Sequence, residues 1–293
     1  LQKELASTAI SPDGKKVVVG FADGTLSLYS LENRKLLWKA TDKHVRDIQR
    51  LAFNSQGNLI VSASLDKTVK VWQDGELQQT FEHQDVVSSV AFAPNSNLIF
   101  TTSYDGQIGL FNPDTGKTNF IKQAHAGEEI NSVTFNTDGK QLLTASDHEI
   151  RLWEVQDNSL NLLKTYPKYQ STIMWATISP NGKRYASVGR DNLVKIYSIK
   201  DGTEQYNLSG HDDSVLKAIF SSDNDQIATV SGDGTLRFWD LTSGNEIFKL
   251  RLPTKIKPPL WDFDFRCTKT GCWIAVPLTN GKLMLYDMGN IYD

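Results

Sequence analysis

Short apolar segments separated by polar turns run along the whole chain. Residues 59–64 and 68–72 are typical, since both are rich in β-branched side chains and lie between turns that contain Gly, Asp or Asn. No stretch repeats apolar residues at the three-and-four spacing of an amphipathic helix, so crossover helices and a parallel sheet are not expected. The pattern predicts an all-β fold built from antiparallel hairpins.

A strand-like segment that ends in an apolar residue and leads into a polar turn occurs seven times. The apolar residues that end these segments are Ile10, Phe53, Phe92, Phe135, Ile178, Phe220 and Phe265. Successive positions are 39 to 45 residues apart, and four-stranded propeller blades repeat every 40 to 45 residues or so. The period therefore predicts seven blades.

A second marker lies inside each unit, where an acidic or amide residue in a tight turn is followed six positions later by an aromatic residue. The pairs are Asp23 and Tyr29, Asp66 and Trp72, Asp105 and Phe111, Asp147 and Trp153, Asp191 and Tyr197, Asp233 and Trp239, and Asn280 and Tyr286. We therefore predict one domain over residues 1–293, a seven-bladed β-propeller with four-stranded antiparallel blades. The approximate blade boundaries are 1–43, 44–82, 83–124, 125–168, 169–209, 210–253 and 254–293.

The markers resemble those of the WD-repeat family over nearly the whole chain. Trp239 and Asp240 form the Trp-Asp dipeptide, and Gly210-His211 matches the Gly-His pair that precedes the first strand of a repeat. The same histidine position is occupied by His44, His83 and His125. The resemblance implies a propeller that serves as a recognition surface.

In that family a histidine, a strand hydroxyl, a turn aspartate and a tryptophan N–H form a hydrogen-bonded tetrad within a blade. A closed network is favoured because an unpaired buried donor costs about 1 to 3 kcal/mol. The resemblance implies three structural tetrads, which are His44, Ser62, Asp66 and Trp72; His125, Thr144, Asp147 and Trp153; and His211, Thr229, Asp233 and Trp239.

Four units depart from this pattern. Tyr29, Tyr197, Tyr286 and Phe111 replace the tryptophan, and we expect those blades to rely on apolar packing. In the last unit only residues 287–293 remain for the outermost strand. We expect that strand to be short or to lie outside this sequence.

The recurring Ser, His and Asp residues could be mistaken for a nucleophilic triad. A catalytic set has one exposed geometry, whereas this set recurs at blade spacing with a tryptophan attached. Asp262 and Asp264 share one face of a strand, as metal ligands can, but no third ligand is evident. We expect no enzyme activity, no cofactor and no bound metal.

Charge, apolar content and cysteine content limit the binding partners and the cellular location that we expect. The net charge of −3 and the pI near 6.0 give no basic field for nucleic-acid phosphates, and no apolar run is long enough for a membrane span. The two cysteines, Cys267 and Cys272, give no disulfide framework, which suits the reducing cytoplasm. We expect a cytoplasmic protein that binds neither nucleic acid nor membrane.

Binding is expected on the loop face around the central channel, because loops on a rigid scaffold vary freely. We consider two positions in each blade: the residue just before the turn Asp or Asn, and the residue four positions before the apolar strand end. Several of these residues are apolar and one is an arginine, a mixture that is typical of interface anchors. The predicted partner-binding residues are Leu65, Tyr104, Arg190, Met174, Leu216 and Trp261. Met174, Leu216 and Trp261 could equally point into the core between blades.

The leading hypothesis is a non-catalytic scaffold or sensor that binds a protein or peptide. The resemblance suggests, by analogy, the C-terminal propeller of a larger bacterial-type signalling protein, because the chain begins at Leu1 rather than Met. One alternative is a small-ligand or modified-peptide site in which Tyr104 and Trp261 contribute an aromatic cage. A propeller hydrolase is the weaker alternative.

Overall fold

The computed structural model describes residues 4–125, 127–156, 159–253, 262–268, 271–278 and 280–289. Its contacts divide it into two compact units. The first unit is formed by Leu1–Ala124 with Trp261–Asp293, and the second by His125–Leu260. Each unit is described by itself.

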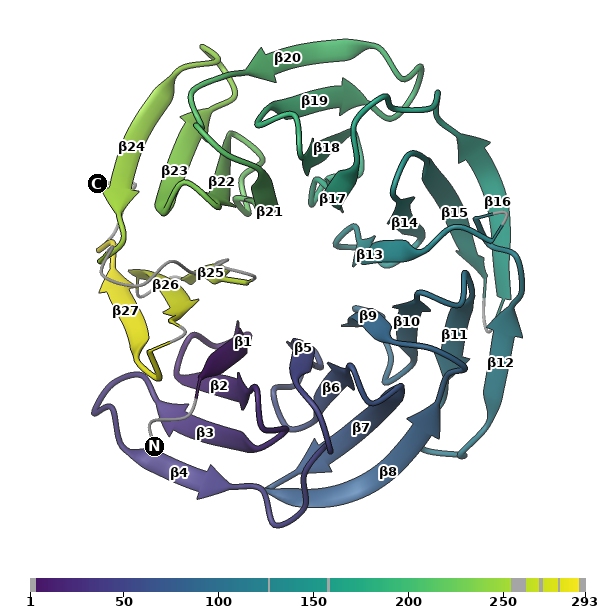
Figure 1. Ribbon diagram of the computed structural model, residues 1–293, viewed down its shortest axis with the longest axis vertical. Helices are drawn as coiled ribbons and strands as arrows, with labels where there is room; N and C mark the ends of the chain where they lie inside the picture. The colour runs from purple at the N-terminus through teal and green to yellow at the C-terminus, as the bar shows by residue number, and fades with distance from the viewer. Residues whose placement is uncertain are drawn as a thin grey trace. The chain divides into compact units, whose positions relative to one another are not determined.

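The predicted class, an all-β seven-bladed β-propeller with four-stranded antiparallel blades, is confirmed (Figure 1). Six sheets have four strands in chain order, and the seventh has three strands within the described residues. Every regular element of the described residues is a strand, so none of them forms a helix that could cross a bilayer.

The first unit contains blades 1, 2, 3 and 7. Blade 1 consists of β1 (Leu5–Ile10), β2 (Lys16–Phe21), β3 (Leu26–Ser30) and β4 (Leu36–Lys39). Blade 2 consists of β5 (Ile48–Phe53), β6 (Ile60–Ser64), β7 (Thr68–Gln73) and β8 (Glu76–Glu82). Blade 3 consists of β9 (Val87–Phe92), β10 (Ile99–Ser103), β11 (Ile108–Phe111) and β12 (Thr118–Ile121). Blade 7 consists of β25 (Asp264–Thr268), β26 (Gly271–Pro277) and β27 (Leu283–Asp287).

The second unit contains blades 4, 5 and 6. Blade 4 consists of β13 (Ile130–Phe135), β14 (Gln141–Ser146), β15 (Ile150–Gln156) and β16 (Ser159–Thr165). Blade 5 consists of β17 (Ile173–Ile178), β18 (Arg184–Gly189), β19 (Val194–Ser198) and β20 (Glu204–Leu208). Blade 6 consists of β21 (Val215–Phe220), β22 (Gln226–Ser231), β23 (Thr235–Asp240) and β24 (Glu246–Arg251).

Burial decreases from the inner to the outer strands of a blade. In blade 2, every residue of β6 is buried, whereas β8 alternates mostly between exposed and partly buried positions. Apolar β-branched residues fill the inner strands because both faces of those strands pack against neighbouring blades. The outer strands carry the polar residues that face water.

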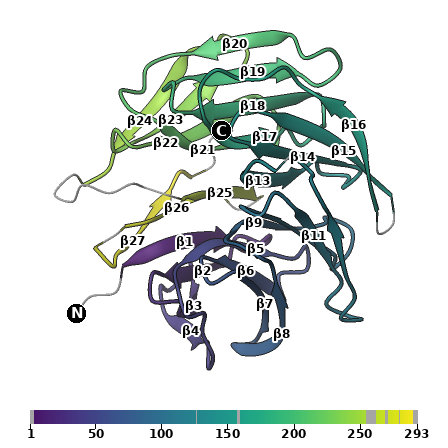
Figure 2. The ribbon, with the colours of Figure 1, turned by 45° about the vertical axis from the view of Figure 1, so that its right-hand side comes forward.

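Side chains join the inner strands of consecutive blades. Ser132 Oγ and Thr134 Oγ1 on β13 accept hydrogen bonds from backbone N–H groups of β17, at 3.1 and 3.3 Å. In the first unit, β26 lies beside β1 (Figures 1 and 2). Here Asp262 and Asp264 join the two blades in the same way. They accept hydrogen bonds from the N–H groups of Thr8 and Ile10, at 3.2 and 2.7 Å.

These contacts explain the carboxylates that we considered as metal ligands. Asp262 also accepts a hydrogen bond of 2.5 Å from the buried Ser7 hydroxyl. Within the described residues, no group of three or more His, Cys, Asp or Glu side chains could hold a metal ion. The pair therefore joins blade 7 to blade 1.

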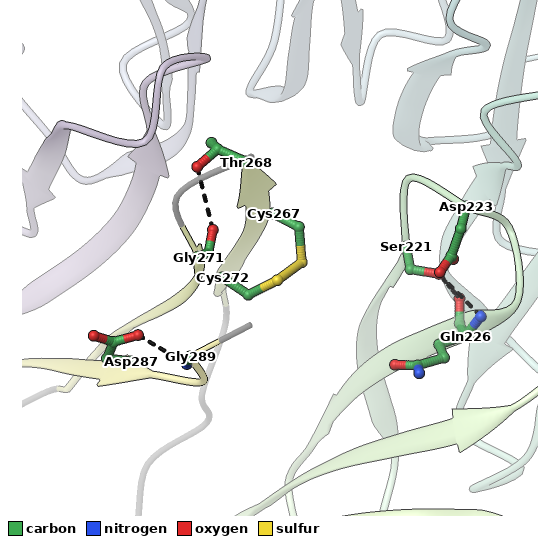
Figure 3. Close-up of a disulfide and its surroundings, with 9 residues drawn as sticks. All are labelled: Ser221, Asp223, Gln226, Cys267, Thr268, Gly271, Cys272, Asp287 and Gly289. Atoms are coloured by element: carbon green, nitrogen blue, oxygen red, sulfur yellow. Dashed lines mark hydrogen bonds between the residues drawn. A yellow bond between two sulfur atoms is a disulfide. The ribbon is translucent and has the colours of Figure 1, made fainter. Parts of the chain in front are cut away.

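One disulfide corrects the expectation that no disulfide contributes to the fold. Cys267 on β25 and Cys272 on β26 are bonded, with their Cα atoms 4.0 Å apart (Figure 3). The strand register places the two residues directly opposite each other. A separation of five residues in the sequence does not reveal that register, which depends on where the hairpin turns.

Candidate functional site

A continuous hydrogen-bonded network links the inner strands of blade 2 to its loop. Trp72 Nε1 donates to Ser62 Oγ at 2.8 Å, and Ser62 Oγ lies 2.7 Å from His44 Nε2. His44 Nδ1 lies 3.0 Å from Asp66 Oδ2, which also accepts the backbone N–H of Val45 at 2.9 Å. The order of donors assigns the imidazole proton to Nδ1, and the network holds the loop against the turn.

Blade 6 contains the equivalent network. Trp239 Nε1 donates to Thr229 Oγ1 at 2.9 Å, and Thr229 Oγ1 lies 2.9 Å from His211 Nε2. His211 Nδ1 lies 3.0 Å from Asp233 Oδ2. The residues in contact are therefore the ones that the family resemblance implies.

The two aspartates of these networks remain charged. Burial raises the pKa of each carboxyl, but hydrogen bonds outweigh that effect. Bonds from Thr235 and His211 hold the pKa of Asp233 at about 2, and bonds from His44 and Thr68 keep the pKa of Asp66 well below its usual range. Both imidazoles are buried, so the networks present no exposed base or nucleophile.

Blade 3 retains part of the network, although we expected it to rely on apolar packing. His83 Nε2 lies 2.7 Å from Thr101 Oγ1, and His83 Nδ1 lies 3.2 Å from Asp105 Oδ2. Phe111 takes the place of the indole and stacks on Phe81, with 4.6 Å between ring centroids. The histidine spacing revealed this set, but the missing tryptophan led us to set it aside.

Blade 4 corrects the predicted tetrad of His125, Thr144, Asp147 and Trp153. Thr144 Oγ1 contacts His125 Nε2 at 2.7 Å and accepts from Trp153 Nε1 at 2.8 Å. Asp147, however, accepts a hydrogen bond from Asn131 Nδ2 at 2.9 Å instead of bonding the imidazole. His125 Nδ1 has no hydrogen-bond partner in the described residues, since the nearest carboxylate oxygen, Glu149 Oε1, lies 3.6 Å away.

The length of the turn is the physical reason. The turn that joins β6 to β7 in blade 2 has five unpaired residues, 64–68. The turn that joins β14 to β15 in blade 4 has only four, 146–149. Counted from the preceding strand, Asp147 lies where Leu65 lies in blade 2. The carboxylate has therefore moved out of the network and bonds Asn131 instead.

Acid should destabilise the protein through His125. Burial, with the positive charge of Arg151, lowers the pKa of His125 to about 3. Between about pH 6.5 and pH 3, the His125 imidazole is protonated in the unfolded chain but stays neutral in the folded chain. The free energy of unfolding therefore falls as the pH drops. From pH 7 to pH 5 we expect His125 to account for a loss of about 2 kcal/mol.

The matched control is His125→Gln, which cannot titrate in this range. Urea unfolding of both proteins at pH 7, 6 and 5 isolates the contribution of this imidazole, because every other titrating group is shared. A pH dependence that is the same in both proteins would contradict a buried neutral His125.

In the first unit, the loops of blades 2 and 3 present an apolar surface. Tyr104 is 36% exposed and Val45 is 82% exposed, while Leu65 is partly buried. Backbone hydrogen bonds from Leu65 N–H to the Asp47 carbonyl and from Tyr104 N–H to the Val86 carbonyl hold these side chains in place. We call residues 44–47, 65–67, 84–86 and 104–106 the blade 2–3 loop surface.

Blades 2 and 3 are bonded to each other within this surface. Lys67 Nζ donates to the Gln84 carbonyl oxygen at 3.0 Å and lies 3.4 Å from Asp85 Oδ1. The contact places Leu65 and Tyr104 on adjacent turns of one continuous face. Both are residues that we predicted for partner binding.

Of the other four predicted binding residues, three belong to the second unit and one is not described by the structure. Arg190 is exposed, Met174 is partly buried and Leu216 is buried, and all three belong to the second unit. The burial of Leu216 matches the alternative in which it packs between blades. Trp261 lies outside the described residues.

Blade 5 contains a cavity that sequence reasoning missed. Its volume is about 440 Å³, and its walls include Lys168, Tyr169, Tyr185, Asp191, Lys195 and Tyr197. Tyr169 lies four residues before β17, the position that His44 and His211 occupy before β5 and β21. Its hydroxyl contacts Tyr185 at 3.4 Å instead of the turn aspartate. Burial raises the pKa of Tyr169, Tyr185 and Tyr197, so the phenols stay neutral.

Asp191 lacks the donors that its equivalents have. Asp66 and Asp233 have side chains that are 4% and 5% exposed, each beside a histidine. Asp191 is 26% exposed and pairs with Lys195 Nζ at 2.7 Å. Within the described residues, its only other hydrogen bond is the one it accepts from the Leu193 N–H at 3.3 Å. Part of this carboxylate therefore faces the cavity.

Comparison with family models agrees with the blade geometry. Residues 116–154, 160–198 and 202–240 match the model described as WD domain, G-beta repeat. The chain contains WD40 repeats. Residues 1–113 match a second model, Nucleolar protein 10-like, N-terminal domain. The equivalent networks of blades 2 and 6 thus lie in segments that are matched by different models.

The curated relatives are also WD-repeat proteins. This chain is 25% identical to cilia- and flagella-associated protein 52 of Sus scrofa over 78% of its own length and 37% of that protein. It is 26% identical to serine-threonine kinase receptor-associated protein of Dictyostelium discoideum, over 80% of its own length and 94% of that protein. It is 27% identical to transcriptional corepressor LEUNIG_HOMOLOG of Arabidopsis thaliana, over 68% of its own length and 25% of that protein. The chain thus matches little more than a third of the porcine relative.

Proposed function

We propose that this chain is a non-catalytic interaction scaffold that binds a protein or peptide on the blade 2–3 loop surface. The observation that carries the proposal is the exposure of Tyr104 and Val45 beside Leu65 on loops that backbone hydrogen bonds hold rigid. Exposed aromatic and aliphatic side chains on a pre-formed surface bind partners with little loss of conformational entropy.

Charges at the edge of this surface suit a polypeptide partner. Lys67 and Asp85 are about half exposed and flank the apolar residues. An apolar centre with a charged rim is the usual composition of a protein interface. The names of two relatives describe a receptor-associated protein and a corepressor, and both terms fit a scaffold.

The test is the double variant Leu65→Ala and Tyr104→Ala, used as bait in affinity capture with mass spectrometry. We expect the proteins captured by the unmutated chain to fall by at least about tenfold, because anchor residues each contribute 2 kcal/mol or so. The free energy of unfolding should stay within about 1 kcal/mol, since neither side chain is fully buried.

The matched control is Leu162→Ala and Leu163→Ala, which removes two comparably exposed residues from the outer strand β16. Capture should be unchanged in this control. Equal loss in both variants would indicate general surface stickiness, and no loss in either would contradict binding at the blade 2–3 loop surface.

Several finer assignments stay predictions. They are a sensor role, a larger bacterial-type parent protein, a cytoplasmic location and a modified-peptide site around Tyr104 and Trp261. The three relatives described above come from a pig, an amoeba and a plant, and they lend the bacterial assignment no support.

A further inference from the structure

Blade 6 holds a guanidinium between two carboxylates. Arg237 Nη1 donates to Glu246 Oε2 at 2.7 Å, and Arg237 Nη2 lies 3.4 Å from Asp233 Oδ2. The Arg237 side chain is 4% exposed. Its Nε also donates to Thr235 Oγ1 at 3.1 Å. This blade thus shows which geometry a buried guanidinium adopts in the fold.

Blade 5 has the same two carboxylates without the guanidinium. Asp191 precedes Lys195 by four residues, as Asp233 precedes Arg237. Glu204 pairs with Tyr197 across β19 and β20, as Glu246 pairs with Trp239 across β23 and β24. Lys195 takes the place of Arg237, and its ammonium forms an ion pair with Asp191.

The second carboxylate of blade 5, that of Glu204, is bonded to a residue that lines the cavity. Tyr197, which lines the cavity, donates its hydroxyl to Glu204 Oε2 at 3.2 Å. The rings of Tyr169 and Tyr197 meet edge to face, with 6.0 Å between centroids. The cavity therefore combines a partly exposed carboxylate with aromatic walls, and a second carboxylate lies beside it.

We propose that this cavity binds the guanidinium group of an arginine side chain from a partner polypeptide. A planar guanidinium can bond both oxygens of Asp191 and stack on a tyrosine ring, which a compact ammonium cannot do as well. Lys195 must leave Asp191 for the ligand to enter, so it acts as a built-in competitor. This site has its own residues and does not rest on the blade 2–3 loop surface.

The experiment is an NMR titration of the full chain, labelled at its tyrosine rings, with N-acetyl-arginine N-methylamide. The corresponding citrulline compound is the neutral isostere, and the corresponding lysine compound tests for a general cation site. We expect saturable shifts of the signals of Tyr169 and Tyr197 with the arginine compound. The citrulline compound should cause none, and the lysine compound should bind at least about fivefold more weakly.

Three variants test whether the cavity prefers a positively charged ligand. Lys195→Met removes the competitor and should strengthen arginine binding by about tenfold. Lys195→Arg should weaken binding by a similar factor, because it would fill the site from within as Arg237 does in blade 6. Asp191→Asn should weaken binding by at least about tenfold, since the ligand loses its counter-charge.

Opposite results would overturn the proposal. If the site prefers anions, binding of the titrated compound would weaken in Lys195→Met, strengthen in Asp191→Asn and stay unchanged in Lys195→Arg. Equal binding of the citrulline compound, or no saturable shift at the highest soluble concentration of the arginine compound, would also contradict it. The melting temperature of each variant shows whether a loss of binding reflects a loss of folding.

Discussion

Replacing Thr229 by Val should lower the free energy of unfolding by about 4 kcal/mol. The change keeps the shape of the side chain but removes the hydroxyl that bonds both Trp239 Nε1 and His211 Nε2 at 2.9 Å. Both groups are buried, so each would lose its partner without gaining water, at a cost of about 1 to 3 kcal/mol each. Urea unfolding followed by tryptophan fluorescence measures the loss.

The matched control is Thr101→Val in blade 3. Thr101 bonds His83 at 2.7 Å, but Phe111 stands where blade 6 has its tryptophan, so only one buried group loses its partner. We expect a loss of about 2 kcal/mol. Equal losses in the two variants would mean that the indole N–H contributes nothing to the network.

Replacing Asp262 by Ala should cost about 4 kcal/mol as well, by loosening the contact between blades 7 and 1. The carboxylate accepts hydrogen bonds from the Ser7 hydroxyl at 2.5 Å and from the Thr8 N–H at 3.2 Å. Both donors are buried, and no other acceptor replaces the lost oxygen atoms in the truncated side chain.

Ser132→Ala is the matched control for Asp262→Ala. Ser132 holds the equivalent position in blade 4 and accepts one backbone N–H, that of Ala176, at 3.1 Å. We expect a loss of about 2 kcal/mol from this change. Thermal unfolding should show the larger decrease for Asp262→Ala, and a smaller one would contradict the role given to this carboxylate.

The blade architecture could be predicted because its signals are local and repeated. Residues that end a strand, such as Phe53 and Phe92, and turn acids such as Asp66 recur at nearly constant spacing. In the structure, Phe53 and Phe92 are the last residues of β5 and β9. A period near that of a blade, repeated seven times, leaves few other folds for the chain.

The networks could be predicted only where the turn length is constant. Four positions separate Ser62 from Asp66, but three separate Thr144 from Asp147, and this difference in the sequence signalled that the carboxylate had shifted. Reading the repeat from the aromatic marker alone concealed the shift, because Asp147 still precedes Trp153 by six residues. The structure shows that the deletion lies in the turn itself.

Other features depended on information that spacing does not carry. Tyr169 is not a histidine, so a search for imidazoles passed over the position that opens the blade 5 cavity. The bond between Cys267 and Cys272 depends on the exact register of a hairpin. The burial of Leu216 depends on how neighbouring blades pack, which the sequence of one strand does not determine.

The short turn of blade 4 shows how this fold can relocate an acidic side chain without changing its strands. A turn that is one residue shorter leaves the strands and their pairing intact, yet it moves an acidic side chain from a histidine to a neighbouring asparagine. The histidine left behind is still held by Thr144, but its buried Nδ1 has lost its partner among the described residues, at a cost of about 1 to 3 kcal/mol. Repeats that differ by a single residue in one turn can therefore share a core while they diverge in the molecules that they recognise.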